Sequence, residues 1–382
     1  MNETWWVSES QLDEKQKHII SLPLEKAHLI VGPPGSGKTN LLVLRGKYRT
    51  LAQRPNFKLI VFTRALREFI VAGTKNYGIA EDKIQTSHAF FREVLRECGV
   101  MPLNDEDFSK QRRLLVDQVA GVVQDRNMTP IFDEILLDEA HDYLPEEVEL
   151  FAKLAKTIFA VVDRRQKIYS GEEPFSVLES LVDGKTELTH HYRNGLNICK
   201  MADNVGKYKA EFEKIAPSCN YDEDQRPSTI EHQQCSSLSE EIESVISKLD
   251  AQIKAYPNEL IGIISPSKSV VQQIWHQIYQ SSFADVASLH SETEPLNLNK
   301  DIRICISTLH AAKGLEYRVL HVLSCEHFAN RPLPRSLAFT AVTRAKTSLY
   351  LYSSDSLLGF LEEAIMALNP SVNLPTTDQL FS

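Results

Sequence analysis

Short apolar runs rich in β-branched residues alternate with amphipathic helical patterns along nearly the whole chain. In the first half the predicted strands are "AHLIVG", "KLIVFT", "EILLDEA" and "TIFAVVD", and segments such as "TNLLVLRGKYRTLA" with a helical period lie between them. The second half repeats this alternation with "LIGIISP", "IRICIST", "RVLHVLS" and "SLYLYSS". Continuous apolar strands separated by amphipathic helices are typical of parallel sheets that helices cover on both faces. The pattern therefore predicts an α/β protein.

The alternation divides into two units. A polar segment, "APSCNYDEDQRPSTIEHQQ", is rich in Pro, Asn, Asp and Gln and indicates a linker or surface loop near the boundary. We expect an N-terminal domain at residues 1–188 and a C-terminal domain at 189–382. The helical pattern "FSKQRRLLVDQVAGVVQDR" predicts a small helical insertion at about 95–130 in the first domain.

Composition limits the class of protein. A chain of 382 residues is long enough for two or three domains, and its net charge of −9 does not by itself indicate nucleic-acid binding. No apolar run approaches the roughly 18 residues of a membrane span, and the N-terminus lacks the pattern of a secretory signal. The six cysteines lie far apart in sequence, which is typical of reduced thiols in a cytoplasmic protein rather than of a disulfide or zinc framework.

The segment "GPPGSGKT" follows a predicted strand and opens a predicted helix. This is the full P-loop pattern in its strand–loop–helix context, in which backbone N–H groups and the helix N-terminus bind phosphate oxygens. We expect Lys38 to reach the β- and γ-phosphates and Thr39 to hold Mg²⁺. The expected phosphate-binding residues are Gly32, Pro33, Gly35, Ser36, Gly37, Lys38 and Thr39.

A second acidic element completes an NTP-hydrolysing site. In "ILLDEAHD" an apolar strand ends in Asp138, which is expected to hold Mg²⁺, and Glu139, which is expected to polarise the attacking water. A solvated acidic strand end is the alternative, and the complete P-loop in the same chain argues against it. ATP and Mg²⁺ are therefore the expected ligands.

Further segments decide what the energy of hydrolysis is used for. They are, in chain order, "LDEKQKHII", "VFTRALREF", "TSHAFF", "VVDRRQKIY", "LTHHYRN", "ISTLHAAKGLEYRVLHV" and "FTAVTRAKTSLYLY". With the P-loop and the acidic strand end, they make the chain resemble superfamily-one helicases of the UvrD/Rep type over nearly its whole length. The resemblance implies two RecA-like parallel-sheet domains with the P-loop NTPase site in the cleft between them.

The resemblance also implies roles for individual residues. Gln16 would read the adenine edge, Gln166 would sense the γ-phosphate from a strand end that also carries Asp163, and Tyr192 would stack on the adenine. Arg193 and Arg344 would be arginine fingers. Two further residues, Gly314 and Glu316, lie in the "TLHAAKGLE" motif and are expected near the nucleotide.

The same resemblance implies a track for nucleic acid. The residues expected to contact it are Phe62, Thr63, Thr86, His88, Tyr169, Thr308 and His310. Phe62 would offer a base-stacking face and Thr63 a phosphate contact. An ordinary core position is the alternative for Phe62 and for the neighbouring Phe90.

Four departures from the family pattern limit the prediction. His141 stands where these enzymes commonly have Gln, and Val162, with Arg164 and Arg165 after Asp163, replaces the usual Gly and spacers. After "QKIY" the family typically carries a Trp that stacks on a base, and this chain has none there unless Phe175 substitutes for it. The chain is also too short for the family's large accessory domains.

These observations predict an ATP-dependent single-stranded-DNA translocase or weak helicase, reliant on a protein partner for unwinding or targeting. A nucleotide-gated clamp with slow turnover is the rival interpretation, and an RNA-directed motor is left open because stacking and phosphate contacts are largely indifferent to the sugar. Neither reading involves a membrane. A 3′-to-5′ direction is implied by the resemblance alone.

Overall fold

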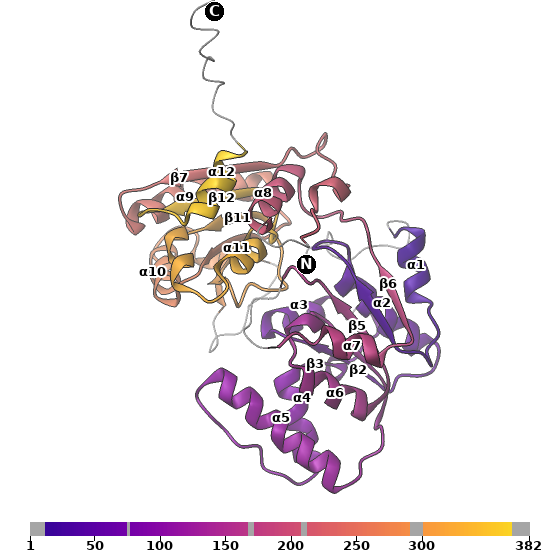
Figure 1. Ribbon diagram of the computed structural model, residues 1–382. Helices are drawn as coiled ribbons and strands as arrows, with labels where there is room; N and C mark the ends of the chain where they lie inside the picture. The colour runs from indigo at the N-terminus through magenta and orange to yellow at the C-terminus, as the bar shows by residue number, and fades with distance from the viewer. Residues whose placement is uncertain (1–11, 75–76, 167–171, 208–211, 291–300, 369–382) are drawn as a thin grey trace, which may run out of the picture. The chain divides into compact units, whose positions relative to one another are not determined.

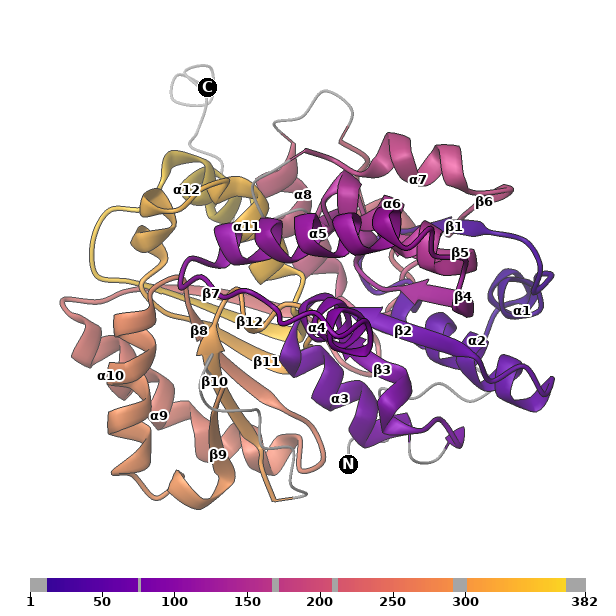
Figure 2. The same cartoon turned by 90° about the horizontal axis from the view of Figure 1, so that it is seen from below.

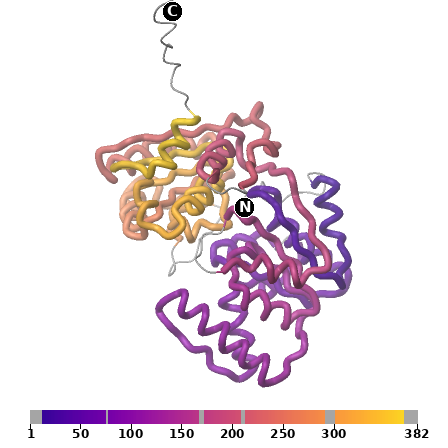
Figure 3. The backbone as a smooth tube through the Cα atoms, in the orientation of Figure 1, coloured from indigo at the N-terminus to yellow at the C-terminus, as the bar shows by residue number. Residues whose placement is uncertain are grey.

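Two parallel sheets organise the protein, as the computed structural model in Figure 1 shows. The structure describes residues 12–74, 77–166, 172–207, 212–290 and 301–368. The first unit ends at His190 and also includes Lys313–Leu315, whereas the second begins at His191. Figure 3 follows the backbone from indigo in the first unit to yellow in the second.

The first sheet has six strands in the order β3-β2-β4-β5-β1-β6, and every neighbouring pair is parallel. The strands are β1 (His28–Val31), β2 (Phe57–Val61), β3 (Ile84–Thr86), β4 (Phe132–Leu137), β5 (Ala155–Val162) and β6 (Gly184–Glu187). Consecutive strand residues enter cores on opposite faces, as Leu29 and Ile30 do. A sheet covered on both faces explains why its strands read as continuous apolar runs.

Helices cover both faces of this sheet. One face carries α1 (Glu14–Ile20), α2 (Lys38–Leu51) and α3 (Arg64–Thr74), and the other carries α4 (Ser87–Glu97), α5 (Phe108–Asp125), α6 (Pro145–Leu154) and α7 (Phe175–Leu181). Figure 2 shows α5 running beside α4 and α6. Single turns of 3₁₀ helix lie at η4 (Glu81–Lys83) and η5 (Ala140–Asp142). The expected helical insertion is thus the single helix α5.

The second sheet also has six parallel strands, in the order β7-β12-β11-β8-β10-β9. They are β7 (Thr229–Gln234), β8 (Ile261–Ser265), β9 (Ala287–His290), β10 (Ile304–Thr308), β11 (Tyr317–Val322) and β12 (Ala345–Ser353). Helices α9 (Leu238–Ala255) and α10 (Lys268–Tyr279) bury their apolar stripes against one face. Helices α8 (Leu196–Gly206), α11 (Pro334–Val342) and α12 (Gly359–Met366) pack together, and the first two also contact β12. Turns of 3₁₀ helix are η6 (Ala216–Ser218), η7 (Ala284–Val286) and η8 (Cys325–Asn330).

The two parallel sheets confirm the α/β class and the two RecA-like domains. In the first sheet, the loops after β1, β2, β4 and β5 leave from the same edge, because parallel strands place their carboxyl ends together. That edge is where the candidate site lies. Among the residues that the structure describes, no helix is long and apolar enough to cross a membrane.

Candidate nucleotide-binding site

The P-loop lies between β1 and α2, as its sequence pattern predicts. Gly35 and Gly37 have φ of 73° and 82°, in the left-handed region that glycine enters without steric cost. A Cβ on Gly32 would come within 2.7 Å of Ser36 Oγ and 2.9 Å of Leu188 Cβ. Glycine at these positions therefore allows the loop to curl tightly over the helix N-terminus.

Lys38, the first residue of α2, folds its side chain back into this loop. Its ammonium group donates hydrogen bonds to the carbonyl oxygens of Gly32 (2.9 Å) and Pro33 (2.7 Å). Ser36 Oγ also donates to Pro33 O, at 2.9 Å. The buried cation is thus held at the centre of the loop, where a phosphate would take the place of the carbonyl contacts.

Gln16, expected at the adenine, lies against the P-loop. It is buried on α1, and its amide Nε2 donates to the carbonyl of Ser36 at 3.1 Å. The same side chain closes a capping box with Asp13, which fixes its position at the start of α1. The structure therefore brings Gln16 together with the loop.

Thr39 and Asp138 form the central contact of the site. Thr39 Oγ1 donates to Asp138 Oδ2 at 2.8 Å, although the two residues lie 99 positions apart in the chain. Burial, followed by the charge of Glu139, raises the pKa of Asp138 to about 7, and the Thr39 hydrogen bond opposes the rise. A hydroxyl and a buried carboxylate are hard oxygen donors that fit Mg²⁺. A cation bound here would relieve the cost of the buried carboxylate.

Glu139 follows directly and has an unusual backbone. Its φ of 47° lies in the left-handed region, which is uncommon outside glycine and is found at functional sites. Its Oε2 atom is buried and has no hydrogen-bond partner among the described residues. His141 Nε2 lies 3.3 Å from this oxygen. Oε2 is thus buried beside the imidazole of His141.

His141, the residue that replaces Gln, connects three parts of the site. Its Nδ1 accepts a hydrogen bond of 3.2 Å from the backbone N–H of Asp163, at the end of β5. Burial, followed by the charge of Lys313, holds the pKa of His141 well below its usual value, so the ring is neutral. A neutral ring that accepts at Nδ1 carries its proton at Nε2, the atom beside Glu139.

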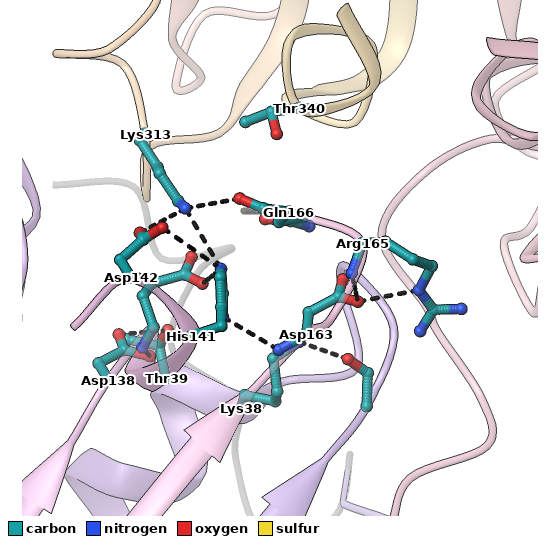
Figure 4. Close-up of polar contacts among 12 residues, drawn as sticks. Lys38, Thr39, Asp138, His141, Asp142, Asp163, Arg165, Gln166, Lys313 and Thr340 are labelled. Carbon is teal, nitrogen blue, oxygen red and sulfur yellow. Dashed lines mark hydrogen bonds and ion pairs between the residues drawn. The ribbon is translucent and has the colours of Figure 1, made fainter. Parts of the chain in front are cut away.

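Lys313 contributes a buried cation to this first unit. As Figure 4 shows, its Nζ pairs with Asp142, donates to the backbone carbonyl of Gln166 at 2.7 Å and lies 3.2 Å from His141 Nε2. Thr63 Oγ1, expected at a phosphate of nucleic acid, donates to the Lys313 carbonyl at 3.1 Å. Gly314, the next residue, has a φ of 86°. A Cβ added to it would lie 2.8 Å from the Leu66 side chain, so Gly314 packs closely against α3.

The polar end of β5 is explained by local pairing. Asp163 is buried and accepts from both the backbone N–H (3.1 Å) and the Nε (2.8 Å) of Arg165. Burial alone would raise the pKa of Asp163, but the charges of Arg165 and Lys38 outweigh it and hold that pKa below its usual value. Arg164 lies 3.4 Å above the Phe175 ring, so a cation covers the aromatic face that was the candidate for base stacking.

The residues expected to contact nucleic acid have mixed surroundings in the first unit. Phe62 is partly buried, with the Arg112 guanidinium 5.1 Å from its ring centre and Tyr143 at 5.7 Å. Thr86 caps α4 through its hydroxyl, and His88 is exposed on the first turn of that helix. Phe90 is a core residue in an aromatic cluster, which is the alternative that its sequence allowed. Tyr169 lies outside the described residues.

In the second unit, Arg193 and Glu316 form a partly buried ion pair, and Lys346 lies 3.5 Å from the other carboxylate oxygen. Arg193 also donates to the Thr343 carbonyl at 3.1 Å. Burial alone would raise the pKa of Glu316, but Arg193 and Lys346 hold it below its usual value. The structure thus brings Arg193 and Glu316 together at the amino ends of β11 and β12.

Arg344 precedes β12 directly and is buried, with its Nε donating to the Thr340 carbonyl at 3.2 Å. Tyr192 remains 39% exposed, which leaves part of its ring accessible. Thr308 is the last residue of β10 and accepts from the Ala311 N–H, and His310 follows it. Because β10 and β11 both run parallel to β8, the Thr308 segment and Glu316 lie at opposite edges of the sheet.

Three site residues had not been predicted. Asp142 pairs with Lys313, Lys346 pairs with Glu316, and Asn194 donates to the carbonyls of Thr343 (2.9 Å) and Ala345 (2.6 Å) from a fully buried position. The acid after "DEAH" and the Asn after "HYR" are local signals that could have indicated the first and the last. Nothing near Lys346 in sequence indicates its partner.

Comparison with known proteins finds solved helicase structures that resemble this chain. Two of the matches are viral: the helicase of PRRSV (13% identity, TM-score 0.40, 88% of this chain and 54% of that chain) and arterivirus nonstructural protein 10, a helicase (14%, 0.43, 91% and 63%). A third is the C-terminal domain of a possible DNA helicase from Lactobacillus plantarum WCFS1 (17%, 0.34, 46% and 96%). This chain spans 54% and 63% of the two viral proteins, and no curated protein matches it.

A family model gives the more specific result. Residues 303–352 match the UvrD-like helicase C-terminal domain. This range contains the "TLHAAKGLE" and "TRA" motifs, with Thr308, Glu316 and Arg344 among its residues. Over these residues the match supports the resemblance to superfamily-one helicases that the motifs indicated.

Proposed function

We propose that this protein hydrolyses ATP and uses the energy to move along single-stranded DNA, as a translocase or a weak helicase of the UvrD/Rep type. The observation that carries the proposal is the hydrogen bond between Thr39 and Asp138, because it joins a complete P-loop to an acidic strand end. The UvrD-like match over residues 303–352 supports the motor rather than another P-loop enzyme. Residues 1–188 and 189–382 are the proposed motor domains.

The first unit supplies the proposed hydrolytic groups. Lys38 exchanges its carbonyl contacts for the β- and γ-phosphates, and Thr39 with Asp138 provides oxygen donors for Mg²⁺. When bound, Mg²⁺ neutralises phosphate charge. Glu139 accepts a proton from the attacking water, and the neutral His141 positions that carboxylate from 3.3 Å. Gln166 is proposed to sense the γ-phosphate from the end of β5.

The second unit supplies the proposed sensing groups. Arg193 and Arg344 stabilise the charge of the transferred phosphoryl group, and Tyr192 stacks on the adenine. Arg193 pairs with Glu316 in this structure, so its guanidinium is held in place. The γ-phosphate is a stronger anion that would compete with Glu316 for it. Loss of the γ-phosphate on hydrolysis then removes that competitor, which gives the cycle two distinct states.

The strand edges suggest where the track lies. Thr63 and Thr86 lie at the carboxyl edge of the first sheet, and Thr308 lies at the carboxyl edge of the second. Hydroxyl groups and backbone at such edges suit phosphate contacts that do not depend on sequence. We propose single-stranded DNA as the track, with RNA as the variant that the same contacts allow.

A nucleotide-gated clamp with slow turnover is the second candidate. The cations of Arg164 and Lys185 over the Phe175 ring favour it. A motor without this stacking platform loses about 1–3 kcal/mol of binding free energy for the base that would stack there. The neutral His141 in place of Gln points the same way. Both features alter the connection between the nucleotide and the track rather than the P-loop itself.

Displacement of streptavidin from the ends of biotinylated single strands separates the two functions. A translocase displaces streptavidin from one end of the strand in an ATP-dependent reaction, and the Lys38→Ala variant does not. A clamp binds the strand tightly with ATP and displaces nothing from either end. Efficient unwinding of long duplexes by the protein alone would contradict the weak-helicase part of the proposal.

A further inference from the structure

Three side chains that commonly bind metals converge in the second unit, outside the nucleotide site. They are His191, Cys199 and Cys219, and their ligand atoms all lie within 4.8 Å of one another. His191 precedes α8, Cys199 lies in its first turns, and Cys219 follows η6. A parallel β-bridge between His191 and Cys219 holds the backbone at these two residues side by side.

The spacing of these atoms suits a tetrahedral ion. Zn²⁺ binds thiolates at about 2.3 Å and imidazole at about 2.0–2.1 Å, so ligand atoms around it are separated by about 3.5–3.8 Å. His191 Nε2 and Cys199 Sγ are separated by 3.4 Å in the structure. Small side-chain rotations would therefore complete the site without moving the backbone.

The surrounding hydrogen bonds leave the histidine free to change partners. His191 Nε2 lies 3.0 Å from the Ile215 carbonyl, which also accepts from the backbone N–H (3.1 Å) and the hydroxyl (3.0 Å) of Ser218. That carbonyl therefore stays paired if the imidazole turns to an ion. His191 is fully buried, and its Nδ1 has no hydrogen-bond partner among the described residues.

We propose that His191, Cys199 and Cys219 form a binding site for a borderline-soft divalent cation, with Zn²⁺ as the natural member of that class. Two sulfur donors and one imidazole select such ions over Mg²⁺ or Ca²⁺, which prefer oxygen. Three protein ligands leave a fourth position for water. The carbonyl oxygen of Asn194 lies 3.4 Å from both sulfurs and accepts from both thiols.

Cys219 is only half-buried, which gives an ion a route from solvent. Asp203, the nearby carboxylate, already accepts from the backbone N–H groups of Ile215 and Ala216, at 2.7 and 3.0 Å, so it stiffens the cluster without being a ligand.

An ion at this position would fix the segment that carries the nucleotide residues. His191 directly precedes Tyr192 and Arg193, and Asn194 anchors the same segment to the amino end of β12. A bound cation would therefore change how Tyr192 and Arg193 contact the nucleotide. This consequence rests on the proposed function, whereas metal binding itself does not.

The test is a Co²⁺ titration of the full-length protein, reduced and stripped of metal, without nucleotide. Co²⁺ bound by thiolates gives intense charge-transfer absorption in the near ultraviolet and strong visible bands typical of tetrahedral coordination. We expect one Co²⁺ per chain with these bands, and their bleaching when Zn²⁺ is added. Cys199→Ser and Cys219→Ser should each weaken Co²⁺ affinity by at least about tenfold.

Cys98→Ser is the matched control, because Cys98 is half-buried at the end of α4 in the other unit. It should leave the spectrum unchanged. Circular dichroism of each variant reports whether it is folded, and the wild-type titration decides the proposal even if a variant is not. Absence of the thiolate bands in the wild type, or an unchanged Co²⁺ affinity in Cys199→Ser or Cys219→Ser, would overturn the proposal.

Discussion

Thr39 Oγ1 donates a hydrogen bond of 2.8 Å to Asp138 Oδ2. The contact joins the start of α2, which follows β1, to the residue after β4, although β5 separates β1 from β4 in the sheet. Both ends belong to motifs whose residue types suit Mg²⁺ and phosphate. The relationship is the structural basis for treating the P-loop and the acidic strand end as one site.

Substitution of the two central hydrolytic residues should separate binding from turnover. Lys38→Ala removes the cation that the loop holds, so both ATP binding and turnover should fall, turnover by at least about 100-fold. Glu139→Gln keeps the shape but cannot accept a proton, so ATP should still bind while turnover is lost. Steady-state hydrolysis and nucleotide binding measured on both variants check this. Normal turnover by Glu139→Gln would show that another group activates the water.

Position 141 offers a test of the residue that departs from the family. A Gln side chain can accept from the Asp163 N–H and donate towards Glu139, as the neutral imidazole does. His141→Gln should therefore retain turnover to within a few-fold, whereas His141→Ala should lose about tenfold or more because Glu139 is no longer positioned. Hydrolysis rates of the pair provide the comparison. If His141→Ala were as active as the wild type, its positioning role would be excluded.

The two arginines of the second unit should act on turnover rather than on affinity. Arg193→Ala and Arg344→Ala each remove a cation proposed to stabilise the transition state, so turnover should fall by about 10³-fold or more while ATP affinity changes little. Lys254→Ala, in an exposed pair with Asp250, is the control and should change neither. Equal losses in affinity and turnover would instead make Arg193 and Arg344 binding residues.

A buried charge cluster should dominate the stability of the first unit. Glu134 is fully buried and lies 3.1 Å from Arg45 and 3.2 Å from Arg49, both also buried. Glu134→Gln leaves two buried cations without a counter-charge and should lower the free energy of unfolding by about 3–5 kcal/mol. Glu14→Gln, in an exposed pair with Lys17, should change it by less than about 1 kcal/mol. Urea unfolding of the three proteins makes the comparison, and similar midpoints would contradict it.

The second unit should lose stability as pH rises. Burial raises the pKa of Glu241 to about 7, and its carboxylate accepts from the Ser324 N–H at 2.8 Å. Because the pKa is higher in the folded state than the usual 4.5, the folded state binds the proton more tightly, and stability falls between pH 4.5 and about 7. Glu241→Gln should remove this fall and stabilise the unit at pH 8 by about 1–3 kcal/mol. Thermal unfolding at pH 5 and pH 8 tests it; an equal effect at both would contradict it.

The sequence was informative where local pattern determines structure. The P-loop needs glycine at Gly35 and Gly37 for its backbone, and parallel strands necessarily bring Thr39 and Asp138 to one edge, so both the fold class and the core of the site follow from pattern. It was harder to predict whether an aromatic side chain lies in the core or on the surface. Phe90 proved to be core, and the ring of Phe175 is covered by Arg164, because packing and not motif decides where an aromatic side chain points.

Long-range pairing was not predictable. Lys313 reaches Asp142 from 171 positions away in the numbering, and nothing in either local sequence specifies the partner. The cluster of His191, Cys199 and Cys219 was missed for the same reason, because its spacing matches no common metal motif and depends on how η6 returns to the start of α8.

ATP hydrolysis by the purified protein should be measured alone and with single-stranded DNA, duplex DNA or single-stranded RNA, with Lys38→Ala as the control for contaminating activity. We predict low basal turnover that single-stranded DNA raises at least about tenfold and duplex DNA much less, and no stimulated turnover in Lys38→Ala. Slow turnover that none of the three polymers changes would contradict a motor and identify the protein as a nucleotide-gated clamp.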